Sequence, residues 1–345
     1  MISLKRWPLF ALLFLLALAW VIYYPGLSGV FLLDDYQNLK TLERIESPAT
    51  LQSLASAVLS NPSGDSGRSL AMLSFAAQHG SWPNDPRAFK QVNLLIHLVN
   101  AALLFLLALQ LGTFRRLTLT QSAITALFVS AIWVVHPMHV STVLYVIKRM
   151  TMLACLFILI GLIGYLLGRR CVLRKPWQGY LMMTNSLVIA GGLALLCKEI
   201  AILLPLYVLI FDTTLLRDTP HPPFYRQWQC IVIWLPIAII FSYFALEYSS
   251  WILPGYDFRN FTPVERLFTE SRVVVNYLGL QLLPRAGEFG LFHDDYVLSH
   301  GLVTPTTTLL SLMALLILLV TAVIQRKRYP AYSFAVFMFL EWTSA

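Results

Sequence analysis

The sequence predicts an all-α polytopic membrane protein, in which residues 1–345 form one domain with about nine transmembrane helices. Of the 345 residues, 58% are hydrophobic and 12% are charged, and the mean hydropathy is +0.69. A soluble domain of this length does not need such a balance to build one core. Apolar runs of about 20 residues, the length that spans a bilayer, recur along the chain. The solvent for most of the chain is therefore lipid.

The net charge of +8 does not indicate nucleic-acid binding, because the basic residues form short clusters between apolar runs rather than one stripe. We interpret these clusters as topology signals. The four cysteines have no paired spacing, so the sequence predicts neither a disulfide framework nor a zinc site.

The first span follows Lys5 and Arg6, which predict a cytoplasmic N-terminus. Ala17 and Ala19 resemble a weak signal-peptide cleavage site, but the apolar run continues beyond them, so we expect an uncleaved first helix. Residues 25–91 then form a long first outer loop.

Further spans are expected at residues 92–111, 120–137, 151–168, 179–197, 200–216, 229–246 and 306–325, with a last helix from about residue 331. The loops between them that should be cytoplasmic carry arginines such as Arg115 and Arg170, as the positive-inside rule requires. The last helix stops in mid-pattern at Ala345, which is consistent with a longer natural chain.

Residues 247–305 are expected to form a second outer loop, because the charge pattern does not allow this stretch to cross the membrane. Within it, residues 267–283 are apolar on much of their surface but carry Glu270, Arg272 and Asn276. This pattern predicts an amphipathic helix that lies in the outer membrane interface.

Two adjacent acids, Asp34 and Asp35, open the first outer loop. Paired acids at a helix exit are often solvated or cap the next helix. A carboxylate at the membrane edge is also a candidate general base. Adjacent residues point in different directions, so only one is expected to act, and we favour Asp34 because it lies nearer the membrane edge. The pair also leaves open a divalent metal ion, although the sequence establishes no cofactor.

Three polar residues of the second span, Asn93, His97 and Asn100, share one helical face. Polar side chains within a span face protein or a water-filled cavity. They therefore either bond neighbouring helices or line a substrate cavity, together with Tyr145 in the loop after the third span.

The loop after the third span carries His136, His139, Lys148 and Arg149. Two histidines without a carboxylate at matching spacing are a weak metal signal, so phosphate contact or proton handling is favoured. Lys148 and Arg149 oppose the positive-inside rule on a short outer loop, which indicates that these charges serve a function there. The planar fork of arginine suits phosphate.

Lys198 and Glu199 lie in a short outer turn between apolar helices, either as a local ion pair or with Lys198 on an anionic headgroup and Glu199 as a further candidate acid. Arg68, Arg272 and the run 293–295 (His-Asp-Asp) complete the outer set, although each alone is an ordinary surface residue. Independent segments thus bring a carboxylate and several cations to one side, as expected of a site for a lipid phosphate.

These motifs, in this order, resemble those of the bacterial relatives of the TMTC-type O-mannosyltransferases, which belong to the GT-C superfamily of membrane glycosyltransferases. The resemblance covers roughly residues 1–300. It rests on Asp34-Asp35, Arg68-Ser69-Leu70, the face of Asn93, His97 and Asn100, the stretch from His136 to Arg149, and Lys198-Glu199.

The resemblance implies a GT-C-like bundle that transfers a sugar from a polyprenyl-phosphate donor to a protein or glycan hydroxyl outside the cytoplasm, usually with inversion. Asp34 or Asp35 would be the base, and Arg149 and Lys198 would bind the donor phosphate. The expected location is the bacterial inner membrane, with the site facing the periplasm.

Two alternatives remain. An O-antigen ligase or polymerase-like transferase usually has its large outer loop late in the chain, whereas here it comes first. A transporter predicts charged or broken segments at the bilayer midplane and an internal repeat, and the sequence has neither.

Overall fold

The computed structural model describes residues 6–46, 48–60, 68–247, 250, 253–289 and 296–343. These residues form helices and connecting turns, and within them the only β-type pairing is an isolated bridge between Gly301 and Thr304. The predicted all-α class is therefore confirmed. The chain divides into two compact units, residues 1–204 and 205–345.

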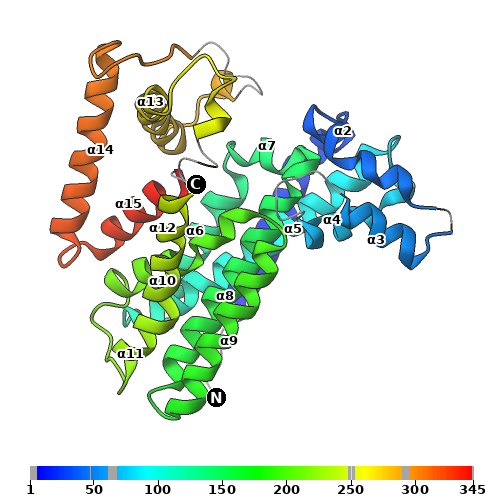
Figure 1. Cartoon of the computed structure of the whole chain (residues 1–345). Helices are drawn as coiled ribbons and strands as arrows, with labels where there is room; N and C mark the ends of the chain where they lie inside the picture. The colour runs from blue at the N-terminus through cyan, green and yellow to red at the C-terminus, as the bar shows by residue number, and fades with distance from the viewer. Residues whose placement is uncertain are drawn as a thin grey trace. The chain divides into compact units, whose positions relative to one another are not determined.

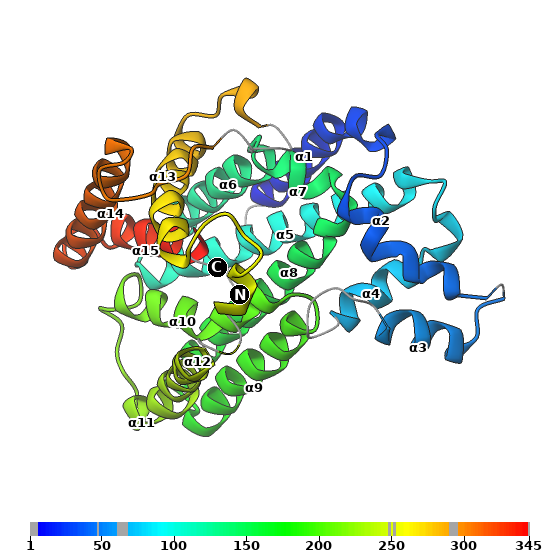
Figure 2. The same ribbon diagram turned by 45° about the horizontal axis from the view of Figure 1, so that its top comes forward.

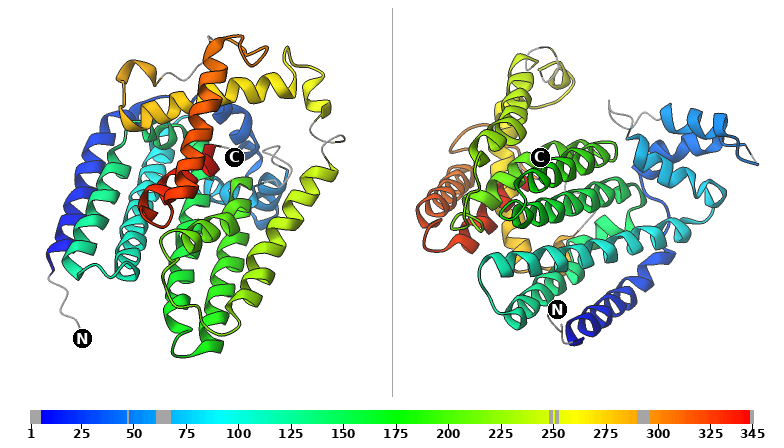
Figure 3. Two further views of the ribbon diagram at one scale, coloured as in Figure 1. Left: turned by 90° about the vertical axis from the view of Figure 1, so that its left-hand side faces the viewer. Right: turned by 90° about the horizontal axis from the view of Figure 1, so that it is seen from below.

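The long helices of the first unit are α1 (Trp7–Tyr23), α5 (Pro86–Phe114), α6 (Leu119–Val135), α8 (Arg149–Cys171) and α9 (Pro176–Leu195). Helix α5 lies at the centre and contacts α1, α6 and α8, while α9 runs along α8 (Figures 1 and 3). Both α5 and α6 start at a cap. The carboxylate of Asp85 accepts the backbone N–H of Ala88, and Thr118 forms a capping box with Gln121.

Helices α8 and α9 approach closely because glycines lie between them. A Cβ atom built on Gly179 would lie 2.4 Å from the Cα of Val172, and one on Gly168 would lie 2.9 Å from the backbone nitrogen of Met183. Small residues allow this kind of backbone contact between membrane helices. The two helices therefore form one closely packed pair.

The predicted first outer loop is largely helical. It contains α2 (Asp34–Leu39), α3 (Leu51–Leu59) and α4 (Ser69–Ala76), with 3₁₀ helices at Tyr24–Ser28, Lys40–Arg44 and His79–Ser81. These short helices share a hydrophobic core with the starts of α5 and α8, to which Leu39, Val58, Met72, Phe75, Phe89 and Ile147 belong. Figure 2 shows α2, α3 and α4 together beside this part of the unit. The segment is thus a packed layer that can hold side chains in fixed positions.

The second unit contains α10 (Leu204–Thr213), α11 (Tyr225–Gln229), α12 (Leu235–Leu246), α13 (Pro263–Leu282), α14 (Thr306–Gln325) and α15 (Pro330–Thr343). A π-helical turn, Cys230–Trp234, joins α11 to α12. Helix α13 packs on α14, and α14 and α15 form a helical hairpin (Figure 3). Helix α13 includes nearly all of the predicted interfacial helix, residues 267–283. It begins at a capping box formed by Thr262 and Glu265. Its place in the interface stays a prediction.

Five helical segments in the described part of the chain are long and apolar enough to cross a membrane: Trp7–Ser28, Pro86–Phe114, Val146–Cys171, Tyr225–Leu246 and Thr306–Gln325. An integral membrane protein is therefore supported, but the nine predicted spans are not all confirmed. Helix α6 has 17 residues and α10 has 10. At about 1.5 Å per residue, α10 alone rises about 15 Å, half of a ~30 Å hydrocarbon core.

Candidate functional site

Arg149, at the start of α8, has a fully buried side chain. Its Nε donates a hydrogen bond to Asn93 Oδ1 (2.8 Å), and its Nη2 donates one to Gln78 Oε1 (2.7 Å). The carbonyl oxygens of Ser74 and Phe89 accept two more, at 3.0 and 2.9 Å. Four of the five N–H groups of the guanidinium are thereby used to join α8 to α4, α5 and the turn after α4. This placement argues for a structural role of Arg149 and against the predicted contact with a donor phosphate.

The polar face of α5 also bonds neighbouring backbone. Asn93 Nδ2 lies 3.2–3.3 Å from three carbonyl oxygens in the segment that follows α6. His97 Nε2 lies 3.0 Å from the carbonyl oxygen of Val134, and Asn100 Nδ2 donates to that of Met152 (2.9 Å). All three side chains are buried. Of the two interpretations open from the sequence, the geometry supports helix-to-helix bonding.

The first residue of helix α7 (His139–Leu144), His139, packs against aromatic rings of α5 and α6. The ring centroid of His139 lies 5.4 Å from that of His97 and 4.7 Å from that of Trp133. Burial, with help from the neighbouring histidines, lowers the pKa of His139 to about 3. His139 is therefore neutral near pH 7 and adds no positive charge for a phosphate. His136 is half-buried, and its Nδ1 accepts the backbone N–H of Met138 (3.3 Å).

The two acids that start α2 have different surroundings. Asp35 is buried, and its two oxygens accept the backbone N–H groups of Leu32 and Ile147, each at 2.8 Å. Burial raises the pKa of Asp35, and these hydrogen bonds act against that rise. Asp34 is exposed, and its own backbone N–H donates to the hydroxyl of Tyr145 (2.9 Å). Asp35 thus ties α2 to the turn before α8, while the carboxylate of Asp34 remains accessible.

Tyr145 connects Asp34 to a positive charge. Burial raises the pKa of the Tyr145 phenol, and the nearby negative charge of Asp34 adds to the rise. The Nζ of Lys148, an exposed residue, lies 5.8 Å from the centroid of the Tyr145 ring. The buried phenol of Tyr145 thus lies beside two exposed residues of the first unit, the acid Asp34 and the base Lys148.

Lys198, in the turn after α9, donates from Nζ to the Oγ1 of Thr151 (2.8 Å). Beside it, the Nε and Nη2 of Arg68 lie 3.0–3.2 Å from the carboxylate oxygens of Glu199. Burial, together with the positive charges of Lys148 and Arg68, lowers the pKa of Lys198 to about 8. Three segments therefore bring Arg68, Lys148 and Lys198 together, and we name these three residues the cationic cluster.

The backbone at Arg68 is unusual. It has φ 44° and ψ 44°, the left-handed region that a residue other than glycine rarely adopts. Leu33, the residue before Asp34, also has a positive φ of 30°. Strained residues of this kind tend to occur at functional sites. Leu33 lies directly before α2, which begins with Asp34 and Asp35, and Arg68 is itself a candidate site residue.

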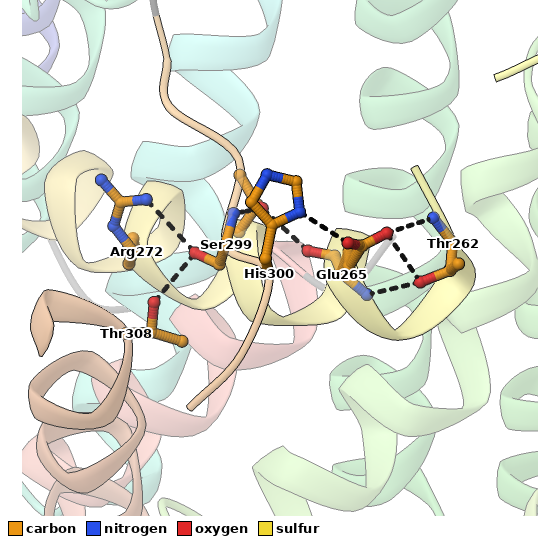
Figure 4. A network of polar contacts seen from close by, with 7 residues as sticks. Thr262, Glu265, Arg272, Ser299, His300 and Thr308 are labelled. Atoms are coloured by element: carbon orange, nitrogen blue, oxygen red, sulfur yellow. Dashed lines mark hydrogen bonds and ion pairs between the residues drawn. The ribbon is translucent and has the colours of Figure 1, made fainter. Parts of the chain in front are cut away.

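The remaining predicted residues do not belong to the described part of the first unit. Arg272 belongs to the second unit, where its Nη1 donates to the carbonyl oxygen of Val297 (2.7 Å) and to Ser299 Oγ (3.2 Å). Figure 4 shows this network, which continues to an ion pair between His300 and Glu265. Residues 293–295 lie outside the described part of the chain. Arg272 therefore has a local use within the second unit.

Among the described residues, no group of three or more His, Cys, Asp or Glu side chains is arranged to hold a metal ion. Sequence reasoning did not single out Thr151, the partner of Lys198, and it did not assign Lys148 to the phosphate site. A usable signal existed, because Lys148 and Thr151 are three residues apart and so share a face at the start of α8.

The chain is a polytopic helical membrane protein that is similar to TMTC-type protein O-mannosyltransferases. It is 30% identical over 192 residues to protein O-mannosyl-transferase Tmtc1 of Drosophila melanogaster. The aligned region covers 54% of this chain and 21% of that protein. Tmtc2 of the same organism is 30% identical over 212 residues (59% and 21%), and human TMTC4 is 26% identical over 206 residues (56% and 28%).

The predicted resemblance is therefore confirmed over about half of the chain. The chain spans between 21% and 28% of the length of these relatives. No family model matches the sequence. No solved structure matches it either.

Proposed function

We propose that this protein is a GT-C-type glycosyltransferase that moves a sugar from a polyprenyl-phosphate donor to a protein or glycan hydroxyl on the outer side of the membrane. The observation that carries the proposal is the cationic cluster, which lies in the first unit together with Tyr145 and the exposed carboxylate of Asp34. The names of the similar proteins, all O-mannosyl-transferases, support the reaction class.

The cationic cluster fits the leaving group of this reaction. As the bond between sugar and phosphate breaks, negative charge grows on the phosphate oxygens. Arg68, Lys148 and Lys198 stabilise that charge more strongly in the transition state than in the bound donor, which lowers the barrier. In this proposal the three residues hold the donor phosphate, and Arg149 instead ties the start of α8, next to Lys148, to α4, which follows Arg68.

Asp34 fits the role of general base. Its exposed carboxylate can take the proton of an acceptor hydroxyl as the oxygen attacks the anomeric carbon. A direct displacement of the lipid phosphate at that carbon inverts its configuration. Asp35 cannot act in this way without giving up its hydrogen bonds to Leu32 and Ile147.

The orientation rests on the charges of the sequence. Lys5 and Arg6 keep the N-terminus in the cytoplasm, so the segment after α1 lies outside, which in a bacterial inner membrane is the periplasm. The donor lipid would then lie in the outer leaflet, with its headgroup at the level of the cationic cluster.

The test is transfer by the purified chain in lipid vesicles that contain polyprenyl-phosphate mannose and a hydroxyl acceptor. We expect sugar transfer, and an inverted anomeric centre in the product by NMR. Equal transfer by the wild-type protein and by a variant with Arg68, Lys148 and Lys198 all replaced by glutamine would contradict the proposal.

A further inference from the structure

The fork of Arg68 is already occupied by a carboxylate of the same chain. Nε and Nη2, the edge of the guanidinium that would hold two phosphate oxygens, both donate to Glu199. The third nitrogen, Nη1, lies 3.5 Å from the sulfur of Met150. A phosphate can therefore reach the fork of Arg68 only if Glu199 moves away.

We propose that Glu199 is an internal anion that holds Arg68 in place and is displaced when the donor phosphate binds. The inference rests on the proposed function and assigns Glu199 a role in donor affinity rather than in proton transfer. A carboxylate and a phosphate present oxygen pairs to the same guanidinium edge, so the two compete directly for Arg68.

The position of Glu199 allows this exchange. Its side chain is 48% exposed, so it can turn into water, whereas the side chain of Arg68 is 23% exposed and is confined by its neighbours. Exposed ion pairs of this kind are weak, and a ligand that also contacts Lys148 and Lys198 gains more than the pair loses.

The neighbouring residue gives Glu199 a second effect. Lys198 precedes it in the same turn and donates to Thr151, so any movement of the turn reaches both Arg68 and the ammonium group of Lys198. The negative charge of Glu199 also neutralises one of the three positive charges of the cluster in the absence of ligand. Without Glu199, the three cations would repel one another with less compensation.

The experiment measures binding of geranyl phosphate, a short isoprenyl phosphate, to the full chain in detergent by isothermal titration calorimetry at fixed pH and ionic strength. Glu199→Gln frees the fork of Arg68, so we expect binding about two- to fivefold tighter than wild type. Glu199→Asp keeps the charge on a shorter side chain and should lie between the two. Inorganic phosphate as a second probe shows whether the isoprenyl chain is needed for tight binding.

Glu46→Gln is the matched control, because it removes one negative charge from an exposed position of the same unit and should leave affinity unchanged. The gain from Glu199→Gln should disappear when Arg68 is also replaced by glutamine. Weaker or equal binding by Glu199→Gln would overturn the inference, and so would a gain that persists without Arg68. If Arg68→Gln and Lys198→Gln both bind like wild type, the phosphate site itself is wrong, and the proposed function falls with it.

Discussion

The buried polar contacts of Arg149 and the more accessible cationic cluster use similar side chains in different surroundings. Arg149 makes four hydrogen bonds inside the first unit and has no exposed surface. Lys148, the residue before it, is exposed and lies over an aromatic ring. The same division separates Asp35 from Asp34. In each pair one residue is buried and holds neighbouring segments together, and the next residue in the chain or the one before it is exposed.

In this comparison, burial of the side chain rather than residue type separates a charge that holds the fold together from one that we propose for ligand binding. Consecutive residues at a helix start point in different directions, so one can be buried while the next is exposed. A buried charge must have partners, and those partners leave no capacity for a substrate. Substituting the buried and the exposed residue of each pair separately tests this difference.

The largest effect is expected for Asp34→Asn. The amide keeps the shape of the side chain but cannot accept the proton of an acceptor hydroxyl, so transfer should fall about a hundred- to ten-thousandfold. Geranyl phosphate binding and thermal stability should stay close to wild type. Asp35→Asn should lower thermal stability and affect transfer less, because the amide can replace only one of two buried acceptor oxygens. Normal transfer by Asp34→Asn would show that the base lies elsewhere.

Replacing Arg149 by methionine should destabilise the protein by about 3–4 kcal/mol, because Asn93, Gln78 and two backbone carbonyls lose a partner in a buried site. Thermal unfolding in detergent measures this. Lys148→Met is the matched control and should change stability by about 0.5 kcal/mol or less. An unchanged melting temperature for Arg149→Met would refute the structural role given to this residue.

Within the cationic cluster, Lys148→Gln and Lys198→Gln should each weaken geranyl phosphate binding by about tenfold, the effect of losing about 1.4 kcal/mol of interaction with the phosphate. Calorimetric titration in detergent measures both. Arg87→Gln, at an exposed position in α5, serves as the control for general charge. If the control weakens binding as much as the other two, the attraction is not specific to the cluster.

A smaller effect should depend on pH. The pKa of Lys198 is about 8, below its usual 10.5, so its charge is lost as pH rises through 8. Geranyl phosphate affinity should therefore fall between pH 7 and 9, and this fall should be absent in Lys198→Gln. The free energy of unfolding responds to pH in the opposite direction. Between pH 8 and 10.5 the unfolded chain binds more protons at Lys198 than the folded chain does, so the contribution of Lys198 to stability rises with pH there. An affinity that is constant in wild type would contradict the position of Lys198 at the phosphate.

The sequence predicted the long helices well, because runs of apolar residues specify them without help from the rest of the chain. It did not predict α3 and α4, which are short and depend on the hydrophobic core that they share with the starts of α5 and α8. The preference for Asp34 over Asp35 agrees with their exposure. The phosphate role of Arg149 does not agree with its burial, because the direction of each side chain at a helix start depends on contacts that lie 56 to 75 residues away in the chain.

The left-handed backbone of Arg68 makes one substitution favourable for stability and unfavourable for the proposed activity. Glycine adopts this conformation without steric cost, so Arg68→Gly should relieve about 1 kcal/mol of local strain. The same change removes one cation of the cluster and releases Glu199. Selection of heat-resistant variants would favour the glycine, while selection for growth that depends on sugar transfer would retain the arginine, so residue 68 should separate the two pressures.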